Sequence, residues 1–256
     1  MAQFNITIAG SVLSVSSLFE STRDYCRAYL TEEAPDFSLR VTWEDLEFEQ
    51  AFLDEEARQE GLRRRKFTDP FLERAAIQRS AAEALLSRDV LLLHGSTVAV
   101  DGEGYLFTAK CGTGKSTHTR LWREAFGGRA VMVNDDKPFI RITGQEVLAC
   151  GAPWSGKHGL DTNVTVPLKG ICVLTRGEEN RIRKAAPEEI LPMLLHQSSP
   201  PRESGALGQY HRLVEALARR VPLWQMECTK EPDAAWVAYR AMSSGTEGGR
   251  LCTENV

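Results

Sequence analysis

Residues 105–117 read Tyr-Leu-Phe-Thr-Ala-Lys-Cys-Gly-Thr-Gly-Lys-Ser-Thr, an apolar stretch that runs into a glycine-rich segment. This pattern predicts a strand, a phosphate-binding loop and a helix. Gly112 and Gly114 allow backbone N–H groups to curl around an anion, because glycine adopts backbone angles that strain other residues. Lys115 can reach the β- and γ-phosphates, and the Ser116 hydroxyl can bind Mg²⁺. The helix that follows would direct the positive end of its dipole at the phosphates, so the predicted ligand is a nucleoside triphosphate.

The predicted nucleotide contacts come from the residues between this strand and the first helical turn. They are Lys110, Cys111, Gly112, Thr113, Gly114, Lys115, Ser116 and Thr117. The full motif begins with glycine, and this chain has Ala109 at that position. Cys111 is interpreted as a small filler of the loop.

Composition places the chain among ordinary soluble globular proteins. It has 256 residues, 42% hydrophobic and 26% charged, enough for one large domain or one domain with a small appendage. The formal net charge of −4 argues against a nucleic-acid or anionic-membrane surface. An acidic stretch at 44–60 precedes a basic cluster at 63–66. We interpret these two stretches as solvated faces that balance each other.

The cysteines and the chain start predict a cytoplasmic protein. The 6 cysteines are scattered without a Cys-x-x-Cys pair, which favours reduced core residues over a disulfide or zinc framework. The first residues lack the basic flank and long apolar segment of a signal peptide. No apolar stretch approaches the roughly 18 residues that a membrane helix needs.

Three regions are expected along the chain: a small α+β region at 1–66, a phosphate-loop core at 67–242 and a disordered tail at 243–256. Alternating polar and apolar residues predict strands at 4–8 and 37–43. Residues 70–87 predict an amphipathic helix. Its apolar face is assigned to Phe71, Leu72, Ala75, Ala82, Leu85 and Leu86.

The core region predicts alternating strands and helices. Strands are expected at 90–93, 130–133, 168–175 and 221–228, and hairpins at 97–108 and 138–150. Helices are expected at 115–126, 187–197, 206–220 and 233–242.

Two adjacent carboxylates, Asp135 and Asp136, follow the predicted strand at 130–133. Adjacent side chains at a strand end point to different sides, so one can hold a metal ion while the other accepts a proton from an attacking hydroxyl. Which aspartate has which role stays open, and Asn134-Asp135-Asp136 could also be a simple turn before Pro138. His94, at the end of another predicted strand, is either structural or a donor to phosphate.

The segment 151–159, Gly-Ala-Pro-Trp-Ser-Gly-Lys-His-Gly, is too rich in glycine and functional side chains for a simple connector. We interpret it as a substrate-facing loop, with Trp154 and Lys157 as the lining residues. Lys157 is the better candidate to meet phosphate charge. The alternative for Trp154 is packing on its own domain.

These motifs in this order resemble the HPr kinase/phosphorylase-like proteins, which share a phosphate-loop fold with ATP-dependent phosphoenolpyruvate carboxykinase. The resemblance is carried by His94-Gly95-Ser96, the segment 109–118, Val-Asn-Asp-Asp-Lys-Pro at 133–138 and the segment 151–157. The match looks closest to the short HPr-kinase-related proteins found beside ribosomal-peptide maturation systems. It is firm over about 90–175 and thinner up to about 242.

The resemblance implies an α/β fold: a core like that of HPr kinase and the carboxykinase, with a mixed sheet and flanking helices. It further implies a kinase that uses ATP and Mg²⁺ to phosphorylate a hydroxyl, such as serine, on a peptide, protein or small molecule. Lys115 would be the phosphate lysine, Ser116 and Asp136 the metal ligands, Asp135 the general base and His94 a residue close to the transferred phosphate. The loop around Trp154 and Lys157 differs from the segment with which HPr kinases hold HPr.

Two alternatives stay open at this stage. Ala109 and Cys111 motivate a nucleotide-binding partner of a peptide-maturation system without catalytic activity. The related carboxykinases motivate a carboxykinase-like enzyme. The sequence leaves open the acceptor, the choice between ATP and GTP, and whether the chain forms a homo-oligomer.

Overall fold

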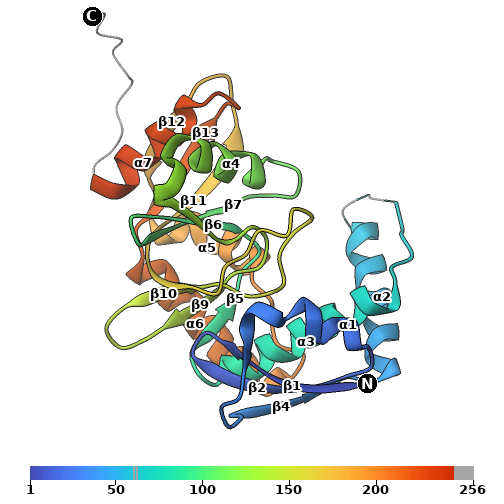
Figure 1. Cartoon of the computed structure of the whole chain (residues 1–256). Helices are drawn as coiled ribbons and strands as arrows, with labels where there is room; N and C mark the ends of the chain where they lie inside the picture. Colours follow the sequence, from blue (N-terminus) through green and yellow to red (C-terminus); the bar gives the residue numbers. More distant parts are fainter. Residues whose placement is uncertain (60, 62, 245–256) are drawn as a thin grey trace, which may run out of the picture. The chain divides into compact units, whose positions relative to one another are not determined.

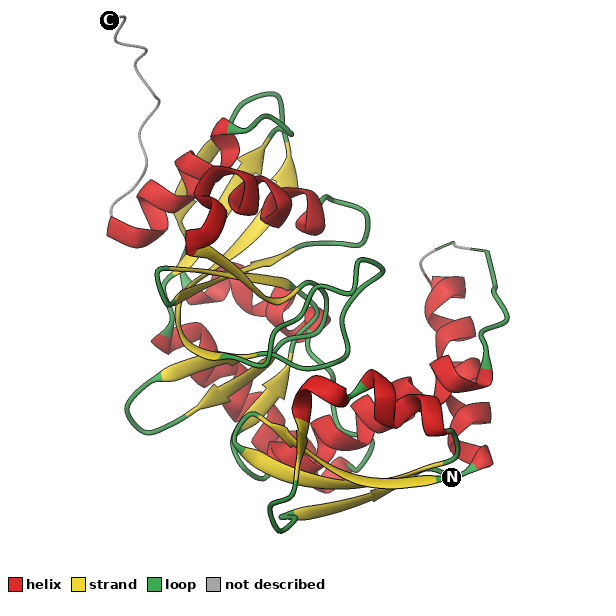
Figure 2. Cartoon of the chain, viewed as in Figure 1, coloured by secondary structure: helices red, strands yellow, loops and turns green. Residues whose placement is uncertain are grey.

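The computed structural model describes residues 1–59, 61 and 63–244. This part of the chain is a mixed α/β protein with mixed sheets and seven α-helices (Figure 1, Figure 2). It divides into two compact units, Met1–Arg88 and Asp89–Val256. The boundary expected after residue 66 stays a prediction about domain organisation.

The first unit is a small sheet with helices. Its strands have the order β3-β1-β2-β4, with β1 and β2 antiparallel and β2 and β4 parallel. Helix α3 contacts α1, α2, β2 and β4. The bounds are β1 (Ala2–Ile8), β2 (Ser11–Ser17), α1 (Glu20–Tyr25), β3 (Leu30–Thr31), β4 (Phe37–Arg40), α2 (Trp43–Gln59) and α3 (Asp69–Leu86).

Three details of this unit differ from expectation. The strand expected at 37–43 ends at Arg40, because Trp43 already begins helix α2. The acidic stretch forms helix α2, and its Glu49 is buried and paired with Arg79 at 2.5 Å instead of solvated. A strongly polar stretch gives no clear apolar stripe, so the helix could not be recognised from periodicity. Helix α3 has almost the expected bounds, but Phe71 is exposed and Ala75 only partly buried. The buried face of α3 includes Ala76 and Ile77 in place of these two residues.

The second unit is built on a nine-stranded sheet. Its strands follow the order β5-β9-β10-β11-β7-β6-β8, with β13 beside β11 and β12 beside β13. The strands are β5 (Val90–Leu92), β6 (Ser96–Val100), β7 (Glu103–Thr108), β8 (Ala130–Asn134), β9 (Phe139–Ile142), β10 (Val147–Cys150), β11 (Thr165–Arg176), β12 (Arg181–Lys184) and β13 (Leu223–Cys228). The helices are α4 (Lys115–Phe126), α5 (Pro187–Gln197), α6 (Leu207–Arg220) and α7 (Asp233–Ser244).

Most expected elements of this unit are confirmed. Helices α4 and α5 have the bounds that the sequence predicts, and both hairpins are present. In the β6–β7 hairpin, Asp101 and Gly102 both have positive φ (53° and 84°), the conformation of a two-residue type I′ turn. Strand β12 was not predicted. Ser243 and Ser244 of the expected tail belong to α7, and the rest of the tail lies outside the described residues.

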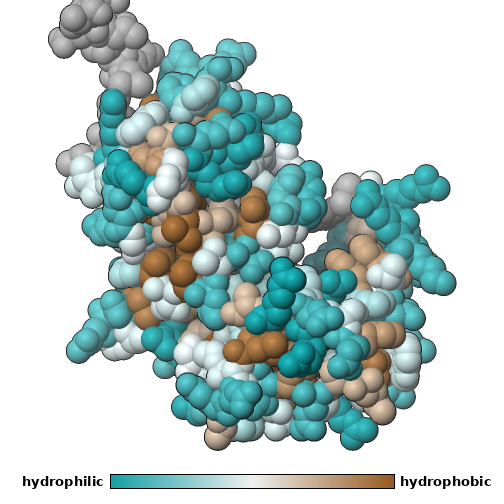
Figure 3. Space-filling view, in the orientation of Figure 1, coloured by the Kyte–Doolittle hydropathy of each residue, from teal (hydrophilic) through white to brown (hydrophobic). Residues whose placement is uncertain are grey.

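Helix α4 is held against the sheet by an aromatic core. It contacts β6, β7, β8 and α7, and its Trp122 is fully buried against Tyr105 and Phe107. His118 also lies in this core, where burial lowers its pKa to about 3 and keeps it neutral. In the view of Figure 3 the surface is mostly hydrophilic, with hydrophobic residues showing in small groups. Among the described helices, none combines the length and the apolar character needed to cross a bilayer.

The register of β6 with its two neighbours brings three chain segments to one edge of the sheet. Strand β6 is antiparallel to both β7 and β8, so β7 and β8 run in the same direction. Thr97, near the start of β6, pairs with Leu106 near the end of β7 and with Asn134 at the end of β8. Neighbouring strands are about 4.8 Å apart, so the ends of β7 and β8 lie about 10 Å apart.

Candidate functional site

The glycine loop 109–114 joins the end of β7 to the start of α4. Gly112 and Gly114 have φ values of 73° and 125°, which residues with a side chain rarely adopt. The ammonium of Lys115 donates back to the Ala109 carbonyl at 3.3 Å, closing the loop on itself. Ser116 is exposed in the first turn of α4. The strand–loop–helix arrangement expected from the sequence is present.

The departure at Ala109 has a simple physical basis. Ala109 is absent from the non-glycine residues with positive φ, so its backbone does not require glycine. Its side chain is fully buried and belongs to the aromatic core around Trp122. A methyl group at this position therefore packs without straining the loop.

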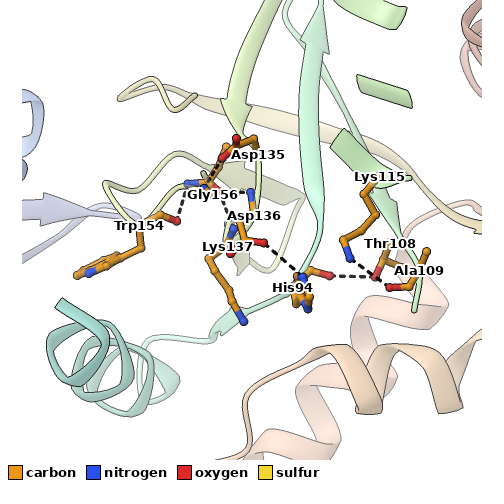
Figure 4. Close-up of polar contacts among 10 residues, drawn as sticks. His94, Thr108, Ala109, Lys115, Asp135, Asp136, Lys137, Trp154 and Gly156 are labelled. Atoms are coloured by element: carbon orange, nitrogen blue, oxygen red, sulfur yellow. Dashed lines mark hydrogen bonds and ion pairs between the residues drawn. The ribbon is translucent and has the colours of Figure 1, made fainter. Parts of the chain in front are cut away.

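Hydrogen bonds tie the segments before β6, after β7 and after β8 into one site. The Thr108 hydroxyl donates to the His94 carbonyl at 2.9 Å, and the Gly95 N–H donates to the Asp136 carbonyl at 2.9 Å. The His94 side chain meets the Asp136 carboxylate, with Nε2 and Oδ1 at 3.3 Å. Figure 4 shows His94 with Asp136 on one side and Thr108, Ala109 and Lys115 on the other.

The positive charges of Lys137 and of Lys115, the first residue of α4, act on His94 and Asp136. Burial, together with the positive charges of Lys137 and Lys115, lowers the pKa of His94, against the attraction of Asp136. Burial opposes ionisation of Asp136, but the His94 hydrogen bond and the charges of Lys137 and Lys115 outweigh it, so the pKa of Asp136 is lowered. A neutral His94 that donates Nε2–H to an ionised Asp136 is consistent with both directions.

Asp135 has a different environment from its neighbour. It is only 3% exposed, and its Oδ1 accepts the Gly156 N–H at 2.5 Å while its buried Oδ2 has no partner. Burial raises the pKa of Asp135, and the charge of Asp136 adds to this effect, against the Gly156 N–H and the charge of His158. The two adjacent carboxylates thus differ in proton affinity, which is the pattern of a base beside a permanent anion.

Gly156 and Asn134 hold these aspartates, and no local sequence pattern points to either role. A Cβ at Gly156 would lie 3.3 Å from Asp135 Oδ1 and 3.3 Å from the Asp136 Cβ, a tight approach that would require the aspartates to move slightly. The fully buried Asn134 amide donates to the Ala152 and Trp154 carbonyls at 2.8 and 3.3 Å. Its Oδ1 accepts the N–H groups of Asp136 and Lys137 at 2.9 and 2.6 Å.

The segment 151–159 divides into a buried and an exposed part. Trp154 is 5% exposed and packs on Phe139. Its ring therefore packs on its own domain, which is the alternative that the sequence left open for it. Lys157 and His158 are exposed, and Gly156 N–H reaches Asp135 directly. Residues 156–159 are therefore the part of this segment that is accessible to a ligand, and Lys157 is the exposed cation in it.

The donor set fits one Mg²⁺ ion shared with a phosphate ligand. Mg²⁺ takes oxygen ligands and usually binds one or two carboxylates together with substrate phosphates and water. Asp136 offers an ionised carboxylate, Ser116 an exposed hydroxyl, and Asp135 a buried oxygen without a partner. Within the described residues no three His, Cys, Asp or Glu side chains form a cage for a metal ion.

Comparisons with known proteins give a likeness among solved structures alone. No protein-family model and no curated protein matches it. Among solved structures, the HPr(Ser) kinase/phosphatase from Coxiella burnetii matches with 11% identity and a TM-score of 0.35, over 60% of this chain and 98% of that one. This is a distant likeness in fold and says nothing about the activity of this chain.

Replacing Asn134 tests whether its amide holds the aspartate turn. Asn134→Ala leaves two carbonyls and two N–H groups without partners, and we expect the free energy of unfolding to fall by about 2–4 kcal/mol. Urea denaturation measures this change. The control is Asn5→Ala, which removes one exposed bond to the Glu33 carbonyl and should change stability by about 0.5 kcal/mol or less. Equal effects of the two variants would show that Asn134 does not hold the turn.

The buried carboxylate of Asp135 should destabilise the fold at neutral pH. Because its folded-state pKa is raised, stability is lost as pH rises past the unfolded value and through the folded one. Asp135→Asn should therefore raise the melting temperature at pH 7.5, and the gain should vanish as pH falls toward 4. Thermal unfolding across this pH range measures the effect.

The matched control is Asp101→Asn, at the turn that closes the far end of the β6–β7 hairpin. Arg129 lowers the pKa of Asp101, so this variant should not gain stability at pH 7.5. An Asp135→Asn protein less stable than wild type at pH 7.5 would contradict the raised pKa.

Proposed function

We propose that this chain is a phosphotransferase that uses Mg-ATP to phosphorylate a hydroxyl group on a peptide, protein or small molecule. The observation that supports this most is geometric: Thr108, where the glycine loop leaves β7, donates to the His94 carbonyl at 2.9 Å, and the His94 side chain meets the Asp136 carboxylate at 3.3 Å. These residues come from three separate segments. A loop that offers N–H groups and a lysine opposite a carboxylate pair is the arrangement that phosphoryl transfer needs.

The proposed reaction needs one base and one leaving group. The acceptor oxygen forms a bond to the γ-phosphorus, the bond from that phosphorus to the bridging oxygen of ADP breaks, and the acceptor proton moves to a carboxylate. Asp135 is suited to take this proton, because a raised pKa brings a general base closer to the working pH. Its Oδ2, which has no protein partner, is the atom that would accept it.

Asp136 and Lys115 are suited to complementary charges. Asp136, with its lowered pKa, stays anionic and would hold Mg²⁺ together with the Ser116 hydroxyl. When bound, Mg²⁺ would neutralise charge on the phosphate oxygens. Lys115 would release the Ala109 carbonyl and contact the β- and γ-phosphates. The neutral His94, whose Nε2–H donates to Asp136, would hold that carboxylate in place close to the transferred group.

The alternatives have less support from the geometry. Ala109 motivates a binder without catalytic activity, but its backbone conformation does not require glycine. The raised pKa of Asp135 beside the lowered pKa of Asp136 suits proton transfer, which a protein that only binds nucleotide does not perform. Carboxykinase-like activity is tested by oxaloacetate-dependent consumption of ATP.

The experiment compares nucleotide binding with turnover in the same variants. Wild-type protein should bind a Mg²⁺ complex of a non-hydrolysable ATP analogue and should slowly transfer the γ-phosphate of Mg-ATP to water or to added hydroxyl acceptors. Asp135→Asn should keep its affinity within about threefold and lose at least about 100-fold in turnover, since a positioned base contributes on the order of 10²–10⁴. Lys115→Ala should weaken binding itself.

Asp101→Asn again serves as the control, because it removes a carboxylate at the other end of the hairpin. It should leave both binding and turnover unchanged. Undiminished turnover in Asp135→Asn would refute its role as the base. Absence of nucleotide binding by the wild-type protein would refute the proposed function as a whole.

A further inference from the structure

Arg176 is brought to the glycine loop by the pairing of two parallel strands. Strand β11 lies beside β7, and Val173 pairs with Thr108 at the end of β7 (Figure 1). Arg176, the last residue of β11, therefore extends past the sheet at the edge where loop 109–114 begins. No local sequence pattern points to this arginine, because 60 residues separate it from the helix that starts at Lys115, and only the strand register brings them together.

The guanidinium of Arg176 makes two hydrogen bonds to the loop backbone. Its Nε donates to the Thr113 carbonyl at 3.3 Å and its Nη2 donates to the Gly112 carbonyl at 2.5 Å. Both donors lie on the same side of the planar guanidinium, so one rigid group binds two successive peptide units. Charged donors make hydrogen bonds about twice as strong as neutral ones.

Binding these carbonyls also sets the direction of N–H groups. In a planar trans peptide the C=O of one residue and the N–H of the next point in opposite directions. With the Thr113 carbonyl turned toward Arg176, the N–H of Gly114 must point to the other side of the loop. The same reasoning applies to the Gly112 carbonyl and the N–H of Thr113, which donates to the Lys110 carbonyl at 3.2 Å.

The loop needs such an external constraint. Gly112 and Gly114 have more accessible backbone conformations than any other residue type, so ordering them is entropically expensive. Anions bind to this kind of loop through several N–H groups that point to one place. A residue that fixes the peptide planes in advance lowers the loss of freedom on binding.

We infer that Arg176 is a positioning residue for the phosphates of the nucleotide: it orients the peptide groups of Gly112 and Thr113 and thereby directs the Gly114 N–H toward the anion. The part of this inference that concerns nucleotide rests on the proposed function. The ordering of the loop does not. The two bonds use two of the five N–H donors of the guanidinium, and lysine, with a single ammonium, cannot reproduce the paired contact.

The experiment uses Arg176→Gln and Arg176→Lys in the full chain. The control is Arg181→Gln, which removes an exposed arginine on β12 that pairs with Glu179. Calorimetry measures the affinity for the Mg²⁺ complex of a non-hydrolysable ATP analogue. Amide hydrogen exchange of segment 109–117, without nucleotide, measures the order of the loop, and thermal unfolding measures the stability of the whole fold.

We expect Arg176→Gln to weaken nucleotide binding about tenfold and to speed exchange of the loop about fivefold, with the melting temperature unchanged within about 2 °C. Arg176→Lys should fall between this variant and wild type, and Arg181→Gln should match wild type. If wild type binds nucleotide and Arg176→Gln behaves like Arg181→Gln, the inference is overturned while the proposed function stands. If wild type binds no nucleotide, the proposed function fails, and unchanged loop exchange in Arg176→Gln would still overturn the ordering role.

Discussion

The convergence of β6, β7 and β8 at one edge of the sheet is the constraint on which the candidate site depends. Thr97 pairs with both neighbouring strands, so the end of β7 and the end of β8 are held at the same level. The glycine loop leaves one strand and the paired aspartates leave the other, with His94 between them. A slip of one residue in this register would turn every side chain on β6 to the other face. The aromatic core under α4 makes such a slip costly.

Burial at Asp135, and the His94 hydrogen bond with the lysine charges at Asp136, separate the proton affinities of the two aspartates. Asp135 is enclosed by the segment that begins at Gly156 and keeps one oxygen without a partner, while Asp136 has a histidine donor and two nearby lysines. Asn134 fixes both the turn that carries them and the segment that covers Asp135. One buried amide thus holds together the turn that carries both carboxylates and the segment that covers one of them. A protein can use such a pair for proton transfer and for holding a cation.

The sequence predicts the elements of this site well and their mutual contacts poorly. Helix α4 and the β6–β7 hairpin follow from local patterns, and the bounds of α4 agree with the structure. The contacts of Arg176, Asn134 and Gly156 depend on register and on close backbone approach, which no local pattern contains. Trp154 illustrates the same limit, because an aromatic residue in a glycine-rich loop can point to solvent or to the core. In this structure it packs against Phe139. Helix α2 could not be predicted from hydrophobic periodicity, because one of its buried residues is a carboxylate, Glu49.

The central claim is that the glycine loop and the aspartate pair enclose a single triphosphate–metal complex. A crystal structure with Mg²⁺ and a non-hydrolysable ATP analogue tests it most directly. The β- and γ-phosphates should contact the N–H groups of the loop and the Lys115 ammonium, with the metal ion bound by the Ser116 hydroxyl and Asp136, directly or through one water. Asp135 should face the γ-phosphate from the side of Gly156. A nucleotide bound elsewhere would contradict the claim. So would a metal ion that neither aspartate contacts, directly or through one bound water.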